Sequence, residues 1–159
     1  MTPDEDRWNA LLRGEDCPFC APRSPDTPFW RQIATLSIST LYLDRNQTYR
    51  GQCLLVFDAR HAVGLESLTR DEGDALFSDL RRAAAAITAV CGPDLMNYAS
   101  LGNVVPHVHW HVVPRYRTDP RWGGPIYTTT RAEMRETLLS AAAYQELIDG
   151  IQRALAATR

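Results

Sequence analysis

The sequence predicts an α+β domain with a mainly antiparallel sheet of about five strands, a long helix between the third and fourth strands, and a C-terminal helix. Short runs rich in β-branched and aromatic residues are separated by polar turns, which favours antiparallel neighbours with the helices on one face. One long segment has apolar residues at helical spacing behind a capping sequence. With 159 residues, the chain is long enough to bury the core of a single domain over residues 1–159.

The N-terminal part is expected to be a short helix followed by loops. Residues 3–13 open with acidic residues and continue with apolar residues at helical spacing, and Gly14 ends the helix. A loop carries Cys17 and Cys20, and residues 21–28 form a connector rich in Pro, Ser and Asp.

Three strands are predicted next, at residues 31–34, 36–43 and 52–57, because these runs are rich in Ile, Leu, Val, Thr and Tyr. The polar segment 44–51 is expected to be a loop or wide hairpin. Residues 54–57 are continuously apolar, which is typical of a central strand.

The long helix is predicted over about 70–90. Thr69 and Glu72 have the spacing of a capping box at its start, and Gly92 followed by Pro93 ends it.

The fourth strand is predicted at 94–100, and a loop rich in Arg and Gly is predicted at 114–125. The C-terminal extension, about 126–159, is ambiguous between extended and helical over 126–139. It contains a predicted final helix at 141–157.

Three of the four histidines of the chain stand at every second position between these segments: His107, His109 and His111. Alternation of this kind predicts a strand with the three imidazoles in a row on one face, ~7 Å apart. Three apolar residues are expected to point the opposite way, into the core: Val108, Trp110 and Val112. A row of imidazoles contributes little to packing and suits chemistry.

Charge and composition exclude several classes of protein. The net charge is −2, so no overall positive field favours stable binding to nucleic acid or an anionic membrane. No apolar run approaches the ~18 residues of a membrane span. The N-terminus lacks the order of a signal peptide, which favours a reducing, cytoplasmic setting over a structural disulfide among the four cysteines.

Cys17 and Cys20 have the Cys-x-x-Cys spacing, which leaves three interpretations open. Two thiolates need two further ligands to close a tetrahedral zinc site. A redox pair would require a thioredoxin-like βαβ context, which is not visible around the pair. The third interpretation is two incidental thiols.

The histidine segment carries a family resemblance. His107-Val-His109-Trp-His111-Val-Val113 resembles the histidine triad motif, in which His and apolar residues alternate and a second apolar residue closes the run. The resemblance covers about residues 15–125 and implies the HIT-like fold.

Two further regions resemble particular members of the family. Leu43-Asp44-Arg45, with Gly51 and the strand at 54–57, is similar to the ribose-contacting segment of fragile-histidine-triad and diadenosine-polyphosphate-hydrolase-like members. The segments 102–106 and 119–125 resemble a bacterial diadenosine tetraphosphate hydrolase-like branch.

The resemblance implies a nucleotide hydrolase or nucleotidyl transferase that acts at the α-phosphate of dinucleoside polyphosphates, phosphoramidates or adenylates. His109 corresponds to the residue that attacks phosphorus and forms a nucleotidyl-histidine, and a pKa near ~6.5 leaves such an imidazole neutral and nucleophilic. The backbone carbonyl of His107 would hold its ring N–H. His111 would contact the phosphate or leaving group and supply or shuttle a proton.

The resemblance also implies substrate contacts at five positions: Asp44, Asn97, Gly102, Asn103 and Val104. Asp44 would accept hydrogen bonds from the ribose hydroxyls, and Asn97 and Asn103 would contact phosphates. Backbone N–H groups of the turn that starts at Gly102 could also bind phosphate oxygens. Many relatives have Ser or Thr where this chain has Val104, so one donor is missing.

Expectations also concern three other side chains in or near the motif. Arg115 and Arg117 could be secondary phosphate contacts or, equally, solvated surface arginines. Trp110 stands where relatives have a smaller apolar residue, and we expect an effect on packing only.

In the same way, the resemblance implies one structural zinc ion, because some members bind zinc with a Cys-x-x-Cys pair, a histidine after the central strand and the first histidine of the triad. Here these residues are Cys17, Cys20, His61 and His107. A Cys₂His₂ set closes a tetrahedral site.

Other interpretations of the same residues remain. A catalytic zinc on His61, His107 and His109 would make a zinc hydrolase or lyase, although it leaves the cysteine pair unexplained. Phosphate in place of water would make the protein a dinucleoside polyphosphate phosphorylase, and a vestigial triad would make it a nucleotide-binding or scaffold module. The expected partner is a small-molecule nucleotide, and a homodimer is expected by analogy.

Overall fold

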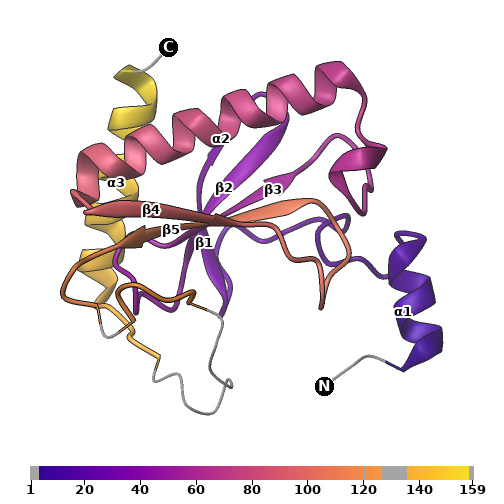
Figure 1. The fold of residues 1–159 in the computed structure, drawn as a ribbon, viewed down its shortest axis with the longest axis horizontal. Helices are drawn as coiled ribbons and strands as arrows, with labels where there is room; N and C mark the ends of the chain where they lie inside the picture. The colour runs from indigo at the N-terminus through magenta and orange to yellow at the C-terminus, as the bar shows by residue number, and fades with distance from the viewer. Residues whose placement is uncertain (1–3, 120, 127–135, 158–159) are drawn as a thin grey trace.

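The computed structural model describes residues 4–119, 121–126 and 136–157. The helices and strands are α1 (Glu5–Leu12), β1 (Trp30–Thr35), β2 (Ser39–Asp44), β3 (Cys53–Phe57), the 3₁₀ helix η1 (Leu65–Ser67), α2 (Arg70–Cys91), β4 (Leu95–Ala99), β5 (His109–Arg115) and α3 (Ala141–Ala157). The five strands form one antiparallel sheet in the order β1-β2-β3-β5-β4 (Figure 1). The predicted α+β fold with a five-stranded antiparallel sheet is confirmed.

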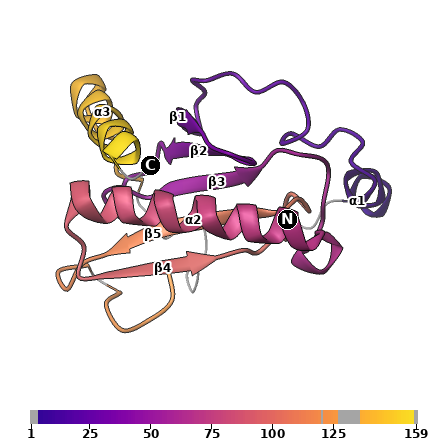
Figure 2. The same cartoon turned by 90° about the horizontal axis from the view of Figure 1, so that it is seen from above.

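The sheet has one face packed against helices and one face that carries the histidines. Helix α2 runs along the sheet and α3 lies beside its end (Figure 2). Val108 and Val112 are buried in the core under α2, and Trp110 is partly buried against Phe77, with 5.9 Å between the ring centroids. The expectation that these three residues point away from the histidines is therefore confirmed.

The helix boundaries follow the capping signals. Thr69 accepts a hydrogen bond from the Glu72 N–H while the Glu72 carboxylate accepts one from the Thr69 N–H, and Gly92 ends α2 in the left-handed conformation. Helix α3 contributes apolar residues to the same core as α2: Tyr144, Leu147, Ile148, Ile151 and Leu155. No helix among the described residues combines the length and apolarity needed to cross a bilayer.

The predicted strand at 36–43 begins too early, since β2 starts only at Ser39. The buried carboxylate of Asp79 accepts hydrogen bonds from the N–H groups of Ser37 and Ile38 and from the hydroxyls of Ser37 and Ser39. This carboxylate on α2 holds the chain in a turn, because those N–H groups are not available to a neighbouring strand.

The expectation of three histidines on one strand is also wrong, because β5 begins at His109. Pro106 has no N–H to offer, and the N–H of Val108 donates to Ala62 rather than to a strand. His107 therefore lies just outside the regular ladder, and its imidazole leaves the row formed by His109 and His111.

The ambiguous segment 126–139 is described only at its two ends. Ile126 is buried, residues 136–139 are neither helix nor strand, and residues 127–135 lie outside the described part of the chain.

Candidate functional site

Strand β5 places His109 and His111 on an inner strand of the sheet, on the face opposite α2. His109 stands opposite Val56 of β3, and His111 stands opposite Leu54 of β3 and Ala99 of β4. Because successive strand residues alternate between faces, the two imidazoles share one face. Their ring centroids are 5.2 Å apart.

The imidazole of His109 has a defined tautomer. Its Nδ1 lies 2.6 Å from the carbonyl oxygen of His107, and a carbonyl can only accept a hydrogen bond. Nδ1 therefore carries the proton and Nε2 carries the lone pair. Burial lowers the pKa of His109, so the ring is neutral at pH 7.

His111 is neutral at pH 7 as well. Burial, and then the charge of a protonated His109, lower the pKa of His111 to about 4. In this state His111 can donate one ring N–H. A bound anion would raise the pKa of His111 and allow the ring to hold a second proton.

A pocket of about 300 Å³ lies beside His111. Its lining residues are Pro28, Phe29, Trp30, Asp44, Arg45, Asn46, Gln52, Leu54, His111 and Glu136. The rings of Phe29 and Trp30 have centroids 6.0 Å apart. Aromatic side chains are suited to stack against a nucleobase. The sequence predicts no role for either ring, because Phe29 and Trp30 belong to none of the motifs that carry the family resemblance.

Asp44 is a second residue predicted from the sequence that lines this pocket, together with His111. Its carboxylate accepts hydrogen bonds from the Asn46 N–H (2.8 Å) and the Gln52 amide (3.0 Å). Burial raises the pKa of Asp44 to about 6, and the charge of Glu136 adds to that shift. The carboxylate is ionised at pH 7 but close to protonation.

Asn97 lies on the same face of the sheet, yet its amide oxygen is engaged. It stands opposite Val113 and accepts a hydrogen bond from Arg115 (2.7 Å). Arg115 is only 3% exposed and pairs with Asp119 at 2.9 Å. Arg115 is therefore not a solvated surface residue, and its charge is neutralised inside the fold. Arg117 is exposed and lies 3.4 Å from Asp94.

The loop before β5 carries the other predicted contacts, and none of them lines the pocket beside His111. Gly102 has φ +67°, a conformation that favours glycine. Asn103 and Val104 are exposed, Val104 at 73%. The structure thus brings Asp44 and His111 together at one pocket, with His109 adjacent, and leaves Asn103 and Val104 on an exposed loop.

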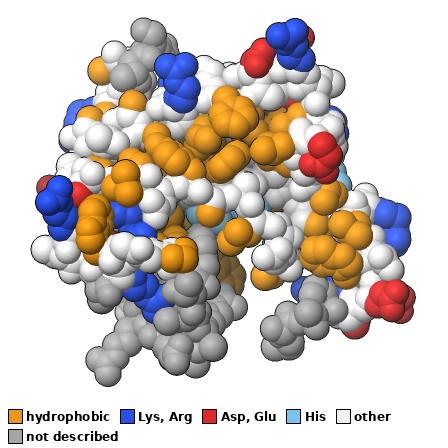
Figure 3. Space-filling view, viewed as in Figure 1, with side chains coloured by type: hydrophobic (Ala, Val, Ile, Leu, Met, Phe, Trp, Pro, Cys, Tyr) orange, Lys and Arg blue, Asp and Glu red, His pale blue; other side chains and the backbone are white. Residues whose placement is uncertain are grey.

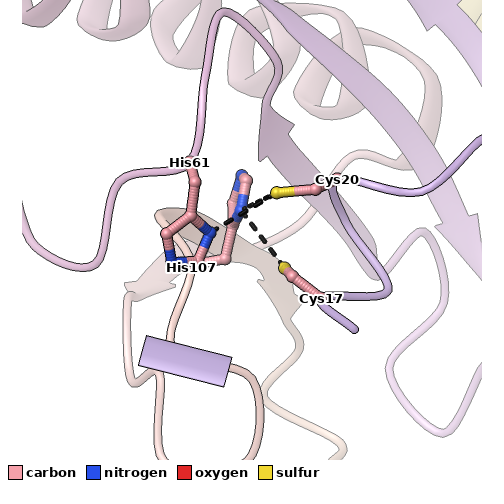
Figure 4. Close-up of side chains that lie close together, drawn as sticks. All are labelled: Cys17, Cys20, His61 and His107. Carbon is pink, nitrogen blue, oxygen red and sulfur yellow. Dashed lines mark hydrogen bonds between the residues drawn. The ribbon is translucent and has the colours of Figure 1, made fainter. Parts of the chain in front are cut away.

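Four other predicted residues converge from three distant segments (Figure 4). The ligand atoms of Cys17, Cys20, His61 and His107 all lie within 4.8 Å of one another. The Nδ1 of His107 is 3.5 Å from each sulfur, and the Nδ1 of His61 is 3.4 Å from the Cys20 sulfur. A tetrahedral zinc ion with bonds of 2.0–2.3 Å separates its ligands by ~3.5 Å, so the donor set fits that metal.

The tautomers of the two histidines also fit a metal. The Nε2 of His107 lies 2.7 Å from the Phe57 carbonyl, and the Nε2 of His61 lies 3.3 Å from the Leu12 carbonyl. Since a carbonyl accepts, each Nε2 carries the proton and each Nδ1 lone pair points at the sulfurs. Ligating histidines in metal sites are held in this way.

Helix α1 and the residues that follow it also shape this cluster, a contact that no sequence motif predicts. Leu12, its last residue, supplies the carbonyl that orients His61. Gly14 has φ +81°, and a Cβ at this position would lie 2.9 Å from the Cγ of His61. The only available signal was a glycine three residues before the first cysteine.

Burial and the neighbouring Cys17 thiol raise the pKa of Cys20 to about 11. A bound cation would reverse this shift, because thiols lose their protons when they ligate zinc.

Comparisons with known proteins agree with this architecture. Residues 33–118 match the HIT domain family. An uncharacterized HIT-like protein of Mycoplasma genitalium is 30% identical over 87 residues, which span 52% of this chain and 62% of that protein.

Three solved structures show the same fold at low identity. A histidine triad protein from Bradyrhizobium japonicum has a TM-score of 0.74 at 24% identity, covering 85% of this chain and 97% of that one. One from Marinobacter aquaeolei has a TM-score of 0.71 at 21% identity, covering 82% and 91%. A zinc-bound histidine triad family protein from Mycobacterium smegmatis has a TM-score of 0.58 at 20% identity, covering 96% and 94%.

The matched segment contains the two strand histidines, the acidic pocket residue and two of the four clustered ligands, and it spans more than half of the sequence. The chain belongs to the HIT domain family.

Proposed function

We propose that this protein is a nucleotide hydrolase or nucleotidyl transferase that acts at the α-phosphate of adenosine nucleotides through a nucleotidyl-histidine on His109. The single observation that carries the proposal is the 2.6 Å hydrogen bond from His109 Nδ1 to the His107 carbonyl, which leaves a lone pair on Nε2 of a neutral, buried ring. Members of the HIT family are generally nucleotide hydrolases or transferases. The finer assignment to the diadenosine tetraphosphate hydrolase-like branch rests on the sequence resemblance.

The reaction would proceed in two steps. The Nε2 lone pair of His109 attacks the α-phosphorus, a P–N bond forms, and the P–O bond to the leaving group breaks. His111, protonated on both ring nitrogens while the phosphate anion is bound beside it, donates a hydrogen bond to the leaving oxygen and delivers the proton that this oxygen requires. Water then attacks the phosphorus and gives a proton to the now neutral His111, and the electrons of the P–N bond return to Nε2 of His109. Phosphate in place of water would give a phosphorylase.

The nucleoside would occupy the pocket beside His111. The rings of Phe29 and Trp30 provide apolar surface for a base, and the Asp44 carboxylate is suited to accept hydrogen bonds from ribose hydroxyls. The exposed turn at Gly102, Asn103 and Val104 would then offer backbone N–H groups to the phosphates. The amide oxygen of Asn97 would be available to the substrate only if its hydrogen bond from Arg115 were broken.

Zinc is proposed as a structural ion on Cys17, Cys20, His61 and His107. The preset tautomers, the ligand separations and the zinc-bound relative from Mycobacterium smegmatis support this assignment. When bound, the ion would hold His107, whose carbonyl in turn orients His109. A catalytic zinc on His61, His107 and His109 is less well supported, because the cluster found among the described residues does not include His109.

The test is a comparison of wild type with His109→Ala. We expect the variant to lose turnover of diadenosine tetraphosphate by about 10³-fold or more, since the nucleophile is absent. Intact-protein mass spectrometry should detect a nucleotidyl adduct on wild type only, and elemental analysis should give one zinc ion per chain in both proteins. Loss of zinc in the variant would favour the catalytic-zinc alternative. Absence of any adduct on wild type during turnover would contradict the proposed intermediate.

We also propose a homodimer through the face formed by α2 and β4. Strand β4 ends the sheet order, so one of its edges is unpaired among the described strands. Apolar side chains gather on the face that carries α2 (Figure 3). Two large exposed ones lie on this face: Phe77 of α2 and Tyr98 of β4. An exposed strand edge beside apolar surface is a common site of association.

A further inference from the structure

Phe19, the third residue of the Cys-x-x-Cys loop, packs directly on the candidate nucleophile. Its ring centroid lies 5.2 Å from that of His109 with the planes at 60°, and 5.7 Å from that of His107 with the planes at 76°. These are edge-to-face contacts, which carry a specific geometry. Phe19 is 8% exposed. The loop that carries two candidate metal ligands therefore also places an aromatic edge against the ring of His109.

The backbone of this loop is tied to the sheet independently of a metal ion. Arg23 donates hydrogen bonds to the Phe19 carbonyl, to the Tyr42 hydroxyl (2.7 Å) and to the Asp58 carboxylate. The Arg23 side chain is 13% exposed, and its guanidinium lies 5.5 Å from the centre of the Tyr42 ring. Asp58 also accepts a hydrogen bond from Thr40 on β2. Arg23 thus connects Phe19 to strand β2 and to the end of β3.

The ring of His109 is consequently restrained from two sides. The hydrogen bond to the His107 carbonyl defines which nitrogen carries the proton. The rings of Phe19 and His111, each with its centroid 5.2 Å from that of His109, oppose rotation of the His109 ring about its bond to the Cβ atom. A flipped ring would exchange the ring nitrogens for carbons and turn Nε2 away from the position it now has. A displacement of ~1 Å at a reacting atom can reduce the rate about 10²-fold.

We propose that Phe19 is a positioning residue for His109 and that Arg23 holds it in place. The proposal rests on the proposed function, in which His109 is the nucleophile. It adds a route from the Cys-x-x-Cys loop to the reaction: the loop sets the orientation of the attacking nitrogen as well as holding an ion.

The first experiment separates positioning from binding. With diadenosine tetraphosphate as the probe, we expect Phe19→Ala to lower kcat by about 10- to 100-fold while KM stays within about twofold, and Phe19→Leu to have a smaller effect in the same direction. The matched control is Phe29→Leu. Phe29 lines the pocket proposed for the nucleoside, so this substitution should raise KM and leave kcat within about twofold of wild type. Both Phe19 variants should keep one zinc ion per chain. Wild-type kcat in Phe19→Ala, or a loss confined to KM, would overturn the proposal.

The second experiment requires no turnover. Long-range ¹H–¹⁵N NMR of the imidazoles should show one Nδ1–H tautomer for His109 in wild type and a second ring state in Phe19→Ala. Arg23→Lys keeps the charge but loses the fork of donors, so we expect it to reproduce part of that change and of the kcat loss. A lower melting temperature with an unchanged His109 spectrum would indicate a merely structural role and refute the proposal. If wild type forms no nucleotidyl adduct, the proposed function fails, and the NMR comparison still decides whether Phe19 positions the ring.

Discussion

At the scale of single residues, the Asp44 carboxyl is held where its charge is unfavourable. Burial is the main cause, and the hydrogen bonds from the Asn46 N–H and the Gln52 amide offset it only in part. A pKa of about 6 lies only about one unit below neutral pH. The carboxylate that we propose to accept hydrogen bonds from ribose hydroxyls therefore becomes protonated in mild acid.

We predict that KM for an adenosine nucleotide rises as the pH falls below about 6. The ribose hydroxyls donate hydrogen bonds to the ionised carboxylate. In the protein without nucleotide, Asp44 has a pKa of about 6, so the affinity for the nucleotide is highest above this pH. Below it, protonation of Asp44 competes with nucleotide binding and the affinity falls. Steady-state kinetics between about pH 5 and pH 8 would measure this. Asp44→Asn should raise KM at every pH and remove the dependence. If the variant kept the same acid limb, another group would be responsible.

At the scale of elements, α1 lies against the candidate metal site formed by Cys17, Cys20, His61 and His107. Only Leu11 of this helix is buried, and the helix lies apart from the sheet in both views (Figures 1 and 2). Its contact with the cluster is made by the Leu12 carbonyl and by the close approach of Gly14 to His61. Because α1 buries so little surface elsewhere, its attachment and the orientation of His61 should depend on each other.

We predict that Gly14→Ala weakens zinc binding. The added Cβ would meet the His61 ring at 2.9 Å, and the left-handed backbone at φ +81° adds strain of about 1–2 kcal/mol. Gly92→Ala is the matched control, since Gly92 has φ +58° with nothing within 4 Å of the added atom. Both variants should lose stability in thermal melts. Only Gly14→Ala should give up zinc to a competing chelator more readily than wild type, and equal retention in the two would argue against this role for Gly14.

At the scale of the whole molecule, the face that carries His109 and His111 and the proposed dimer face are opposite sides of one sheet. His109 and His111 point away from α2. Tyr98 of β4 stands opposite Val112 of β5 and points toward α2. Helix α3 shares the core under α2, which supports the expectation of one domain over 1–159. That expectation stays a prediction, as does a cytoplasmic location.

We predict that wild type is a dimer by light scattering coupled to size exclusion, and that Tyr98→Asp shifts it to monomer. A carboxylate at a contact between two copies would be buried without a partner. Leu138→Asp is the control, because Leu138 is an exposed apolar residue far from α2 and β4 in sequence. A wild-type monomer, or dissociation in both variants alike, would contradict the proposed interface.

Local signals account for what could be predicted. The Thr69–Glu72 capping box and Gly92 defined α2 to within one residue, because helix ends depend on neighbouring backbone groups. Alternation correctly assigned His109 and His111 to one face. The same rule failed at His107, because Pro106 and the contact of Val108 with Ala62 interrupt the ladder.

By itself, the sequence determined the fold class, the strand that carries His109 and His111, and the four residues of the candidate metal site, the last through family resemblance. Only the tertiary structure decided how these residues divide. His107 turns toward Cys17, which is 90 residues away, Arg115 donates to Asn97 on the neighbouring strand, and Phe19 contacts His109. Contacts at such separations depend on how the sheet and its loops pack, because no local propensity or spacing rule relates residues that meet only after folding.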